Sequence, residues 1–221
     1  MLNSKIKELK QLLLTEAGWV EKMISLALDG LYSHNNDLLN IVIGYEDKVN
    51  QMDLEIENKC ISAIALYQPE AKDLRKIVMI LKINNDLERL GDRAVNIAES
   101  AMHLMGKPVV SQVSELAQMR DSAFAMLKAS LDAFATENAE ACSAICEADS
   151  RVDELNRAVY HRLVDLIKQD TPLTESCLHL LRVARNLERI ADLSTNVAEN
   201  TVYLAVGKVI KHQQGEEDNP E

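Results

Sequence analysis

Acidic and amide side chains recur on one face of two helices predicted from the sequence, and their spacing favours cation binding. The stretch from Asp86 to Glu99 (DLERLGDRAVNIAE) returns 100 positions later, from Asn186 to Glu199 (NLERIADLSTNVAE). Steps of 4, 4 and 3 place the shared polar residues on one helix face. Carboxylates at i and i+4 repel each other by about 0.2–0.5 kcal/mol, so we expect a cationic group nearby that offsets this repulsion. The shared residues are Glu88, Asp92, Asn96 and Glu99 in the first copy and Glu188, Asp192, Asn196 and Glu199 in the second.

The helix before each copy has a polar line of its own. Four to six oxygens would converge in each half if this helix packs beside the one with the motif. Such ligands suit hard cations, and iron and manganese also accept them. The candidate ligands on this helix are Glu46, Asn50 and Asp53 in the first half and Asp149 and Asp153 in the second.

A solvated acidic face is the alternative interpretation of these stripes. Arg89 and Asp92 are spaced i,i+3, as are Arg189 and Asp192, so each acid could pair with its own helix. Repetition of the pattern in both halves favours the metal hypothesis, because a solvated face has no reason to keep it.

Long amphipathic helices must position these residues. Apolar residues recur at helical spacing, and no stretch alternates as a half-buried strand does. The repeat of 100 residues predicts an all-α fold of two tandem three-helix bundles, built from six long antiparallel helices. The break at Gly106-Lys107-Pro108 separates a first repeat, 1–106, from a second, 107–207, and 208–221 is expected to be an acidic disordered tail. The helices are expected at about 5–32, 37–67, 69–105, 111–135, 136–169 and 171–207, with Ser111 as the cap of the fourth and Thr136 or Asn138 opening the fifth.

Composition narrows the classes of function. The chain has 221 residues, a net charge of −11 and no dense basic cluster, which argues against nucleic-acid binding. The N-terminus lacks the pattern of a secretory signal, and no apolar run approaches the roughly 20 residues that cross a bilayer, so a cytoplasmic location is expected. The four cysteines lack a metal-type CxxC spacing.

The duplicated motif resembles the signature of the PhoU family, the phosphate-uptake regulators of bacteria. That signature is an acid-xxx-Asp pair on two helices of each three-helix repeat. Glu88-xxx-Asp92, Glu188-xxx-Asp192 and Asp149-xxx-Asp153 match it, and Pro69 to Arg75 looks like the family's P-x-x-x-D-L-R stretch. The resemblance covers residues 5–206. Glu46-xxx-Asn50 departs from the acid pair, so the first-half site is expected to bind metal less tightly than the second or to use Asp53.

This resemblance implies a regulator that binds its partners without catalysing a reaction. PhoU-like proteins contact the ATPase of the phosphate ABC transporter and a sensor histidine kinase, and repress the phosphate regulon when phosphate is plentiful. They are peripheral to the membrane through these partners and commonly form homodimers. The resemblance also implies divalent or trivalent metal ions, iron or zinc, on the acidic stripes.

Two other classes of protein stay open on the residues alone. The first is a metal-free helical adaptor whose acidic faces dock basic partner surfaces. The second is a carboxylate-bridged metal storage or redox protein, although none of the five histidines lies three positions after a Glu, as the di-iron oxidases require. The chain shows no Walker motif, nucleophile elbow or HExxH, so we expect no enzyme.

Overall fold

The computed structural model describes residues 1–207, and every regular element in this part of the chain is a helix, which confirms the predicted all-α class. The predicted tail, 208–221, lies outside the described residues. Two short 3-10 helices, η1 (Pro108–Gln112) and η2 (Thr171–Leu173), precede α4 and α6. The long helices are α1 (Leu2–Ser33), α2 (Asn36–Tyr67), α3 (Ala71–His103), α4 (Ser114–Thr136), α5 (Ala141–Gln169) and α6 (Thr174–Val206).

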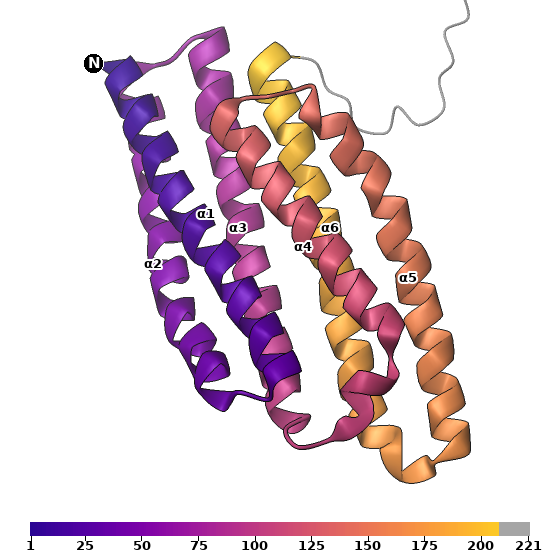
Figure 1. The fold of residues 1–221 in the computed structure, drawn as a ribbon. Helices are drawn as coiled ribbons and strands as arrows, with labels where there is room; N and C mark the ends of the chain where they lie inside the picture. Colours follow the sequence, from indigo (N-terminus) through magenta and orange to yellow (C-terminus); the bar gives the residue numbers. More distant parts are fainter. Residues whose placement is uncertain (208–221) are drawn as a thin grey trace, which may run out of the picture.

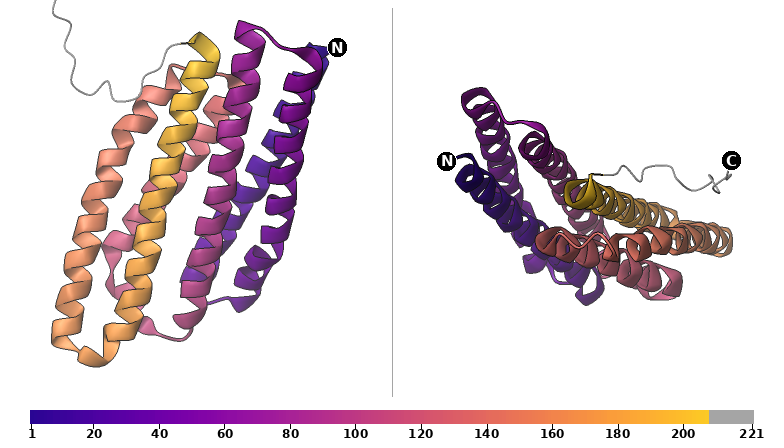
Figure 2. Two further views of the ribbon diagram at one scale, coloured as in Figure 1. Left: turned by 180° about the vertical axis from the view of Figure 1, so that it is seen from behind. Right: turned by 90° about the horizontal axis from the view of Figure 1, so that it is seen from above.

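The six helices form two three-helix bundles that lie side by side (Figure 1). Helices α1 to α3 make the first bundle and α4 to α6 the second. The bundles meet along α3 and α6, which run antiparallel at the centre, while α2 and α5 lie at the outer edges (Figure 2). The two bundles therefore touch along the length of α3 and α6, and not only at residues 106–108, where the chain passes from one repeat to the next. At one end of it the rings of His103 and His179 stack 4.3 Å apart.

Local side-chain chemistry explains where several helices begin. The Asn35 Oδ1 accepts hydrogen bonds from the backbone N–H groups of Asp37 and Leu38, which caps α2. The Asn138 Oδ1 likewise accepts from the backbone N–H groups of Glu140 and of Ala141, the first residue of α5. The expectation that Ser111 caps the fourth helix is wrong. Its hydroxyl donates to the Pro108 carbonyl at 2.8 Å inside η1, because Pro108 starts a 3-10 turn that delays α4.

The apolar face of the motif helix is buried, as its spacing predicts. Leu90, Ala94, Ile97 and Ala101 are each at most 1% exposed. α3 packs against α1, α2 and α6, so little of its circumference remains for solvent. The polar stripe on α3 therefore lies close to other helices.

The start of α3 is tied to the end of α6 through Arg75, the last residue of the D-L-R stretch. The Arg75 guanidinium lies 5.7 Å from the centre of the Tyr203 ring and packs against Gly207. Gly207 ends α6 with a φ of 74°, a left-handed conformation that glycine adopts without strain. The D-L-R stretch thus links the two bundles.

Candidate functional site

Four carboxylates from two helices converge in the second bundle. We call Asp149, Asp153, Glu188 and Asp192 the α5–α6 seam. Burial, and after it the negative charges of Asp192, Asp153 and Glu188, together raise the pKa of Asp149 to about 6. The Arg189 guanidinium lies 2.8 Å from the Asp192 carboxylate and offsets one of these charges. The structure therefore brings together the acids that the sequence pairs in this half.

The first bundle has a corresponding α2–α3 seam, formed by Asp53, Glu57, Glu88 and Asp92. Burial raises the pKa of Glu88, and the nearby charges of Asp92 and Asp53 add to the effect. The pKa of Asp53 is also raised, first by burial and then by Glu57. Arg89 pairs with Asp86 at 3.6 Å and not with Asp92 as the i,i+3 spacing suggested; the Asp92 carboxylate lies 4.0 Å from the Arg93 guanidinium instead.

Two other predicted ligands on α2 lie outside the seam. Glu46 is half-buried and Asn50 is exposed. Within residues 1–207 no hydrogen bond or ion pair joins either of them to the other predicted ligands. Asp53 is thus the predicted α2 residue that the structure brings to the acids of α3.

The far end of the α3 stripe faces the other bundle. Arg182 of α6 donates hydrogen bonds to the Asn96 side-chain oxygen and to the Glu99 carboxylate, the latter at 2.7 Å. Asn196 lines a hollow of about 420 Å³ between α3 and α6, and Glu199 lies near Cys146 of α5. The polar stripe of α3 therefore faces two neighbours: its first part lies at the α2–α3 seam, and its last part contacts α6. Arg182 is far from the motif in sequence, so no local pattern predicted this contact.

Glu16 of α1 is a site residue that the sequence analysis missed. Its side chain is fully buried, and neither carboxylate oxygen has a hydrogen-bond partner within the described chain. Burial raises its pKa to about 9, with further contributions from the charges of Asp53 and Glu88. The available signal was its position: Glu16 follows Leu13 by three residues and precedes Val20 by four, on the apolar stripe of its helix.

These acids fit a hard cation in chemistry but do not yet form a coordination shell. Carboxylate and amide oxygens are the ligands that hard cations prefer. However, in residues 1–207 no three His, Cys, Asp or Glu side chains stand in an arrangement that could hold one metal ion. An ion bound in either seam would therefore require the carboxylates to turn toward it.

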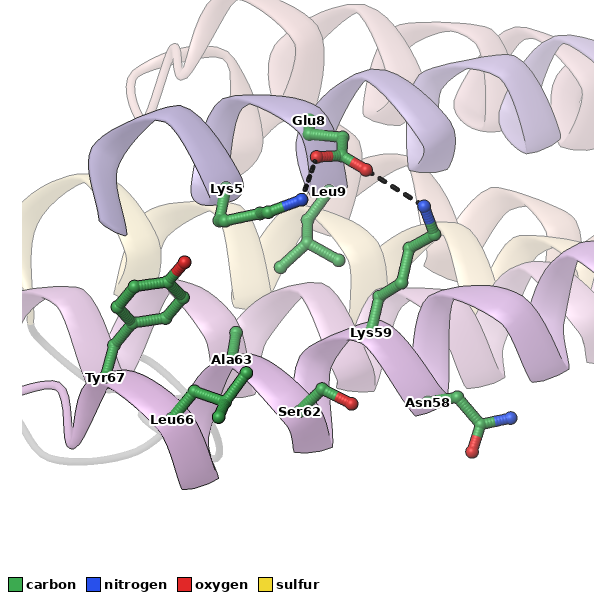
Figure 3. A pocket seen from close by; sticks show the side chains of 9 residues that line it. All are labelled: Lys5, Glu8, Leu9, Asn58, Lys59, Ser62, Ala63, Leu66 and Tyr67. Carbon is green, nitrogen blue, oxygen red and sulfur yellow. Dashed lines mark hydrogen bonds and ion pairs between the residues drawn. The ribbon is translucent and has the colours of Figure 1, made fainter. Parts of the chain in front are cut away.

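A separate hollow between α1 and α2, of about 260 Å³, contains none of the predicted ligands (Figure 3). Glu8 bridges it, with its carboxylate 2.8 Å from the Lys5 ammonium and 2.9 Å from that of Lys59. Hydrogen bonds to Lys5 and Lys59 lower the pKa of Glu8 to about 2. Its charges are already paired, so this hollow has no excess acid to attract a cation.

Comparison with known proteins assigns the chain to a family. The family model for the PhoU domain matches it twice, at residues 13–101 and 116–201. The chain belongs to the PhoU family. A phosphate-specific transport system accessory protein PhoU homolog of Clostridium acetobutylicum is 36% identical over 211 residues, which cover 95% of this chain and 96% of that protein. The PhoU accessory protein of Escherichia coli is 30% identical over 215 residues, which cover 97% of this chain and 89% of that protein.

The fold also matches PhoU crystal structures. That of PhoU from Pseudomonas aeruginosa superposes with a TM-score of 0.89 at 30% identity, over 94% of this chain and 100% of that one. The relatives are named as accessory proteins of phosphate transport. Among residues 1–207 of this PhoU-family chain, no helix is long and apolar enough to cross a membrane.

The raised pKa of Asp149 predicts how the stability of the metal-free protein depends on pH. Its pKa is about 6 in the folded state against an ordinary 3.8, so the folded state holds this proton more tightly than the unfolded state. Stability should therefore fall as pH rises from about 4 to about 6, and stay lower above that. The Asp149→Asn variant should lose this part of the pH dependence and melt higher than wild type at pH 7.5 in EDTA. Asp165→Asn, which changes an exposed acid on the same helix, is the control. Parallel melting curves for Asp149→Asn and wild type from pH 4 to 7.5 would contradict the prediction.

Proposed function

We propose that this chain regulates phosphate uptake in the cytoplasm, by contacting the ATPase of the phosphate ABC transporter and a sensor histidine kinase. On this proposal it represses the phosphate-starvation genes when phosphate is plentiful. The observation that carries the proposal is the match along nearly the whole chain to proteins named as accessory proteins of phosphate-specific transport. The proposed action is binding without catalysis, by an assembly that includes a homodimer of this chain.

We further propose that the two acid seams bind divalent or trivalent cations, with iron and zinc as the candidates. The residues that would hold them are Asp53, Glu88 and Asp92 in the first bundle and the four acids of the α5–α6 seam in the second. When bound, a cation supplies positive charge that removes the repulsion between half-buried carboxylates. The chain's own carboxylates would then join α2 to α3 and α5 to α6, and the folded state would gain stability by mass action.

Such a cross-link offers a physical route to regulation. A binding module acts on a partner by binding one of its conformations more tightly than another. Ligands drawn from two helices fix the position of those helices relative to each other, and hence the shape of the surface that they present. α2 and α5 form the outer edges of the molecule, where a partner has access to them (Figures 1 and 2).

The competing hypothesis is a metal-free adaptor that uses the same acids against basic surfaces of a partner. It is favoured by the absence, within the described residues, of a finished group of three metal-ligating side chains. Metal analysis of protein purified without chelator separates the two hypotheses, because only the first predicts bound metal.

The regulatory proposal predicts the effect of deleting the gene. Phosphate-starvation genes should stay switched on in high phosphate, and a plasmid copy of the wild-type chain should switch them off again. A transcriptional reporter measures this, with phosphate uptake followed in the same cultures. Low reporter expression and normal uptake in the deletion strain would overturn the proposed function.

The metal proposal predicts the behaviour of the Asp92→Asn/Asp192→Asn double variant. It removes one carboxylate from each seam, so the bound metal per chain should fall severalfold, and chelation should lower its melting temperature less than that of wild type. Asp47→Asn/Asp165→Asn is the matched control, because both residues are exposed and outside the seams. Equal metal content in wild type and the seam variant, with melting unchanged by chelation in both, would leave the metal-free adaptor.

A further inference from the structure

The core of the first bundle holds oxygen acceptors that lack any donor. Neither carboxylate oxygen of Glu16 has a hydrogen-bond partner within residues 1–207, and the same is true of the Asn84 side-chain oxygen. Glu16 is 0% exposed and Asn84 is 2% exposed. A buried acceptor without a partner is costly, and such atoms in a native core call for a group that satisfies them, such as a water molecule or an ion.

Asp53 and Glu88 extend this group of acceptors. The Asn84 amide N–H donates to the Asp53 carboxylate and, at 3.1 Å, to the Asp53 carbonyl oxygen, which leaves its own side-chain oxygen free. The charges of Asp53 and Glu88 both act on the Glu16 carboxyl, so all three acids lie close together. We call Glu16, Asp53, Asn84 and Glu88 the core acid cluster. It draws oxygens from α1, α2 and α3.

The second bundle lacks this cluster. Buried residues of α1 and α4 correspond at a spacing of 103 positions, and those of α2 and α5 do the same. By these spacings Met119 corresponds to Glu16 and Asn156 to Asp53, and by the 100-residue spacing of the motif Ala184 corresponds to Asn84. Only Glu88 keeps an acidic counterpart, Glu188. The matching buried pairs include Leu13 and Leu116, Val20 and Ala123, Ile24 and Leu127, Val49 and Val152, and Ile56 and Val159.

We propose that the core acid cluster binds one hard divalent cation, of the class of Mn²⁺, Mg²⁺ or Ca²⁺, at a site that the second bundle does not have. Its donors are oxygens alone, from three carboxylates and one amide, which is the set that these cations prefer. The ion would lie on the inner side of the α2–α3 seam, where α1 contributes Glu16. Glu16 and Glu88 turn toward the ion as it binds, since the described side chains do not already surround one.

This proposal rests on the proposed cation binding by the seams. It reverses the expectation from the sequence that the first half binds metal less tightly than the second. Asn50 supplies a neutral oxygen where Asp153 supplies a carboxylate, which predicted weaker binding in the first half. Glu16 adds a carboxylate from a third helix, and it does so where the second half has Met119. The first bundle should therefore hold its cation at least as tightly as the second.

Glu16→Met tests the proposal, because it installs the residue that the second bundle already accommodates. Chelator-stripped wild type and variant are titrated with MnCl₂ at pH 7.5, with free Mn²⁺ followed by its electron paramagnetic resonance signal. The variant should lose one class of Mn²⁺ site or bind it roughly 10–100-fold more weakly. Without metal it should melt higher than wild type, because a buried unpartnered carboxyl is gone, and Mn²⁺ should raise its melting temperature less.

Two further variants make the outcome specific. Glu16→Gln keeps the size of the side chain and should also lose the site, which covers the case in which the methionine packs badly. Asp192→Asn should weaken only the sites of the second bundle and leave the Glu16-dependent class intact. If wild type, Glu16→Met and Glu16→Gln bind the same amount of Mn²⁺ with the same affinity, the core site does not exist, although the α5–α6 seam could still bind. If wild type binds no Mn²⁺ at all, the core site is wrong, while iron or zinc binding by the seams is tested separately by metal analysis and the regulatory role by the deletion strain.

Discussion

Repulsion between half-buried carboxylates is the constraint on which the rest of this molecule depends. Each bundle half-buries acids from neighbouring helices, and burial, followed by repulsion from the neighbouring carboxylates, raises the pKa of Asp149 to about 6. Apolar packing elsewhere must outweigh that cost for the helices to stay together. A fold that repeats such an arrangement in both halves gains most from a cation that removes it. The regulatory proposal and the metal proposal are linked through this constraint, because the same helices present the outer surface.

The long contact between α3 and α6 connects the two halves. Both helices of this contact contribute acids to a seam, and the stripe that supplies Glu88 and Asp92 continues to Asn96 and Glu99, which Arg182 holds from the other bundle. Arg75 makes a second link at the end of α6. A change in the position of α3 on cation binding would therefore also shift α6. The bundles should respond to their ligands as one unit.

Much of the fold could be predicted because helical periodicity is a local signal. The spacing of Leu90, Ala94, Ile97 and Ala101 predicted their buried face, and the duplicated motif predicted two bundles. The pairing of Asp149 and Asp153 with Glu188 and Asp192 followed from placing neighbouring helices side by side. The 3-10 helix η1 was not predicted, and within it the Ser111 hydroxyl donates to the Pro108 carbonyl instead of capping α4.

Contacts between distant segments could not be predicted in the same way. The hydrogen bonds from Arg182 to Asn96 and Glu99 depend on how the bundles pack, and no local sequence pattern around these residues predicts them. Glu16 is different, since a charged residue on an apolar stripe is visible in the sequence. Its partners Asp53, Asn84 and Glu88 become apparent only when α1, α2 and α3 are assembled.

Crystals of the full chain grown with ZnCl₂, and others grown with MnCl₂, would show cation binding by the seams directly, through the anomalous scattering of the bound metal. We expect anomalous peaks within coordination distance of Asp149, Asp153, Glu188 and Asp192 in the second bundle and of Asp53 and Glu88 in the first. Well-ordered carboxylates at both seams, surrounded by water alone and with no anomalous peak at millimolar Zn²⁺ or Mn²⁺, would contradict cation binding by the seams.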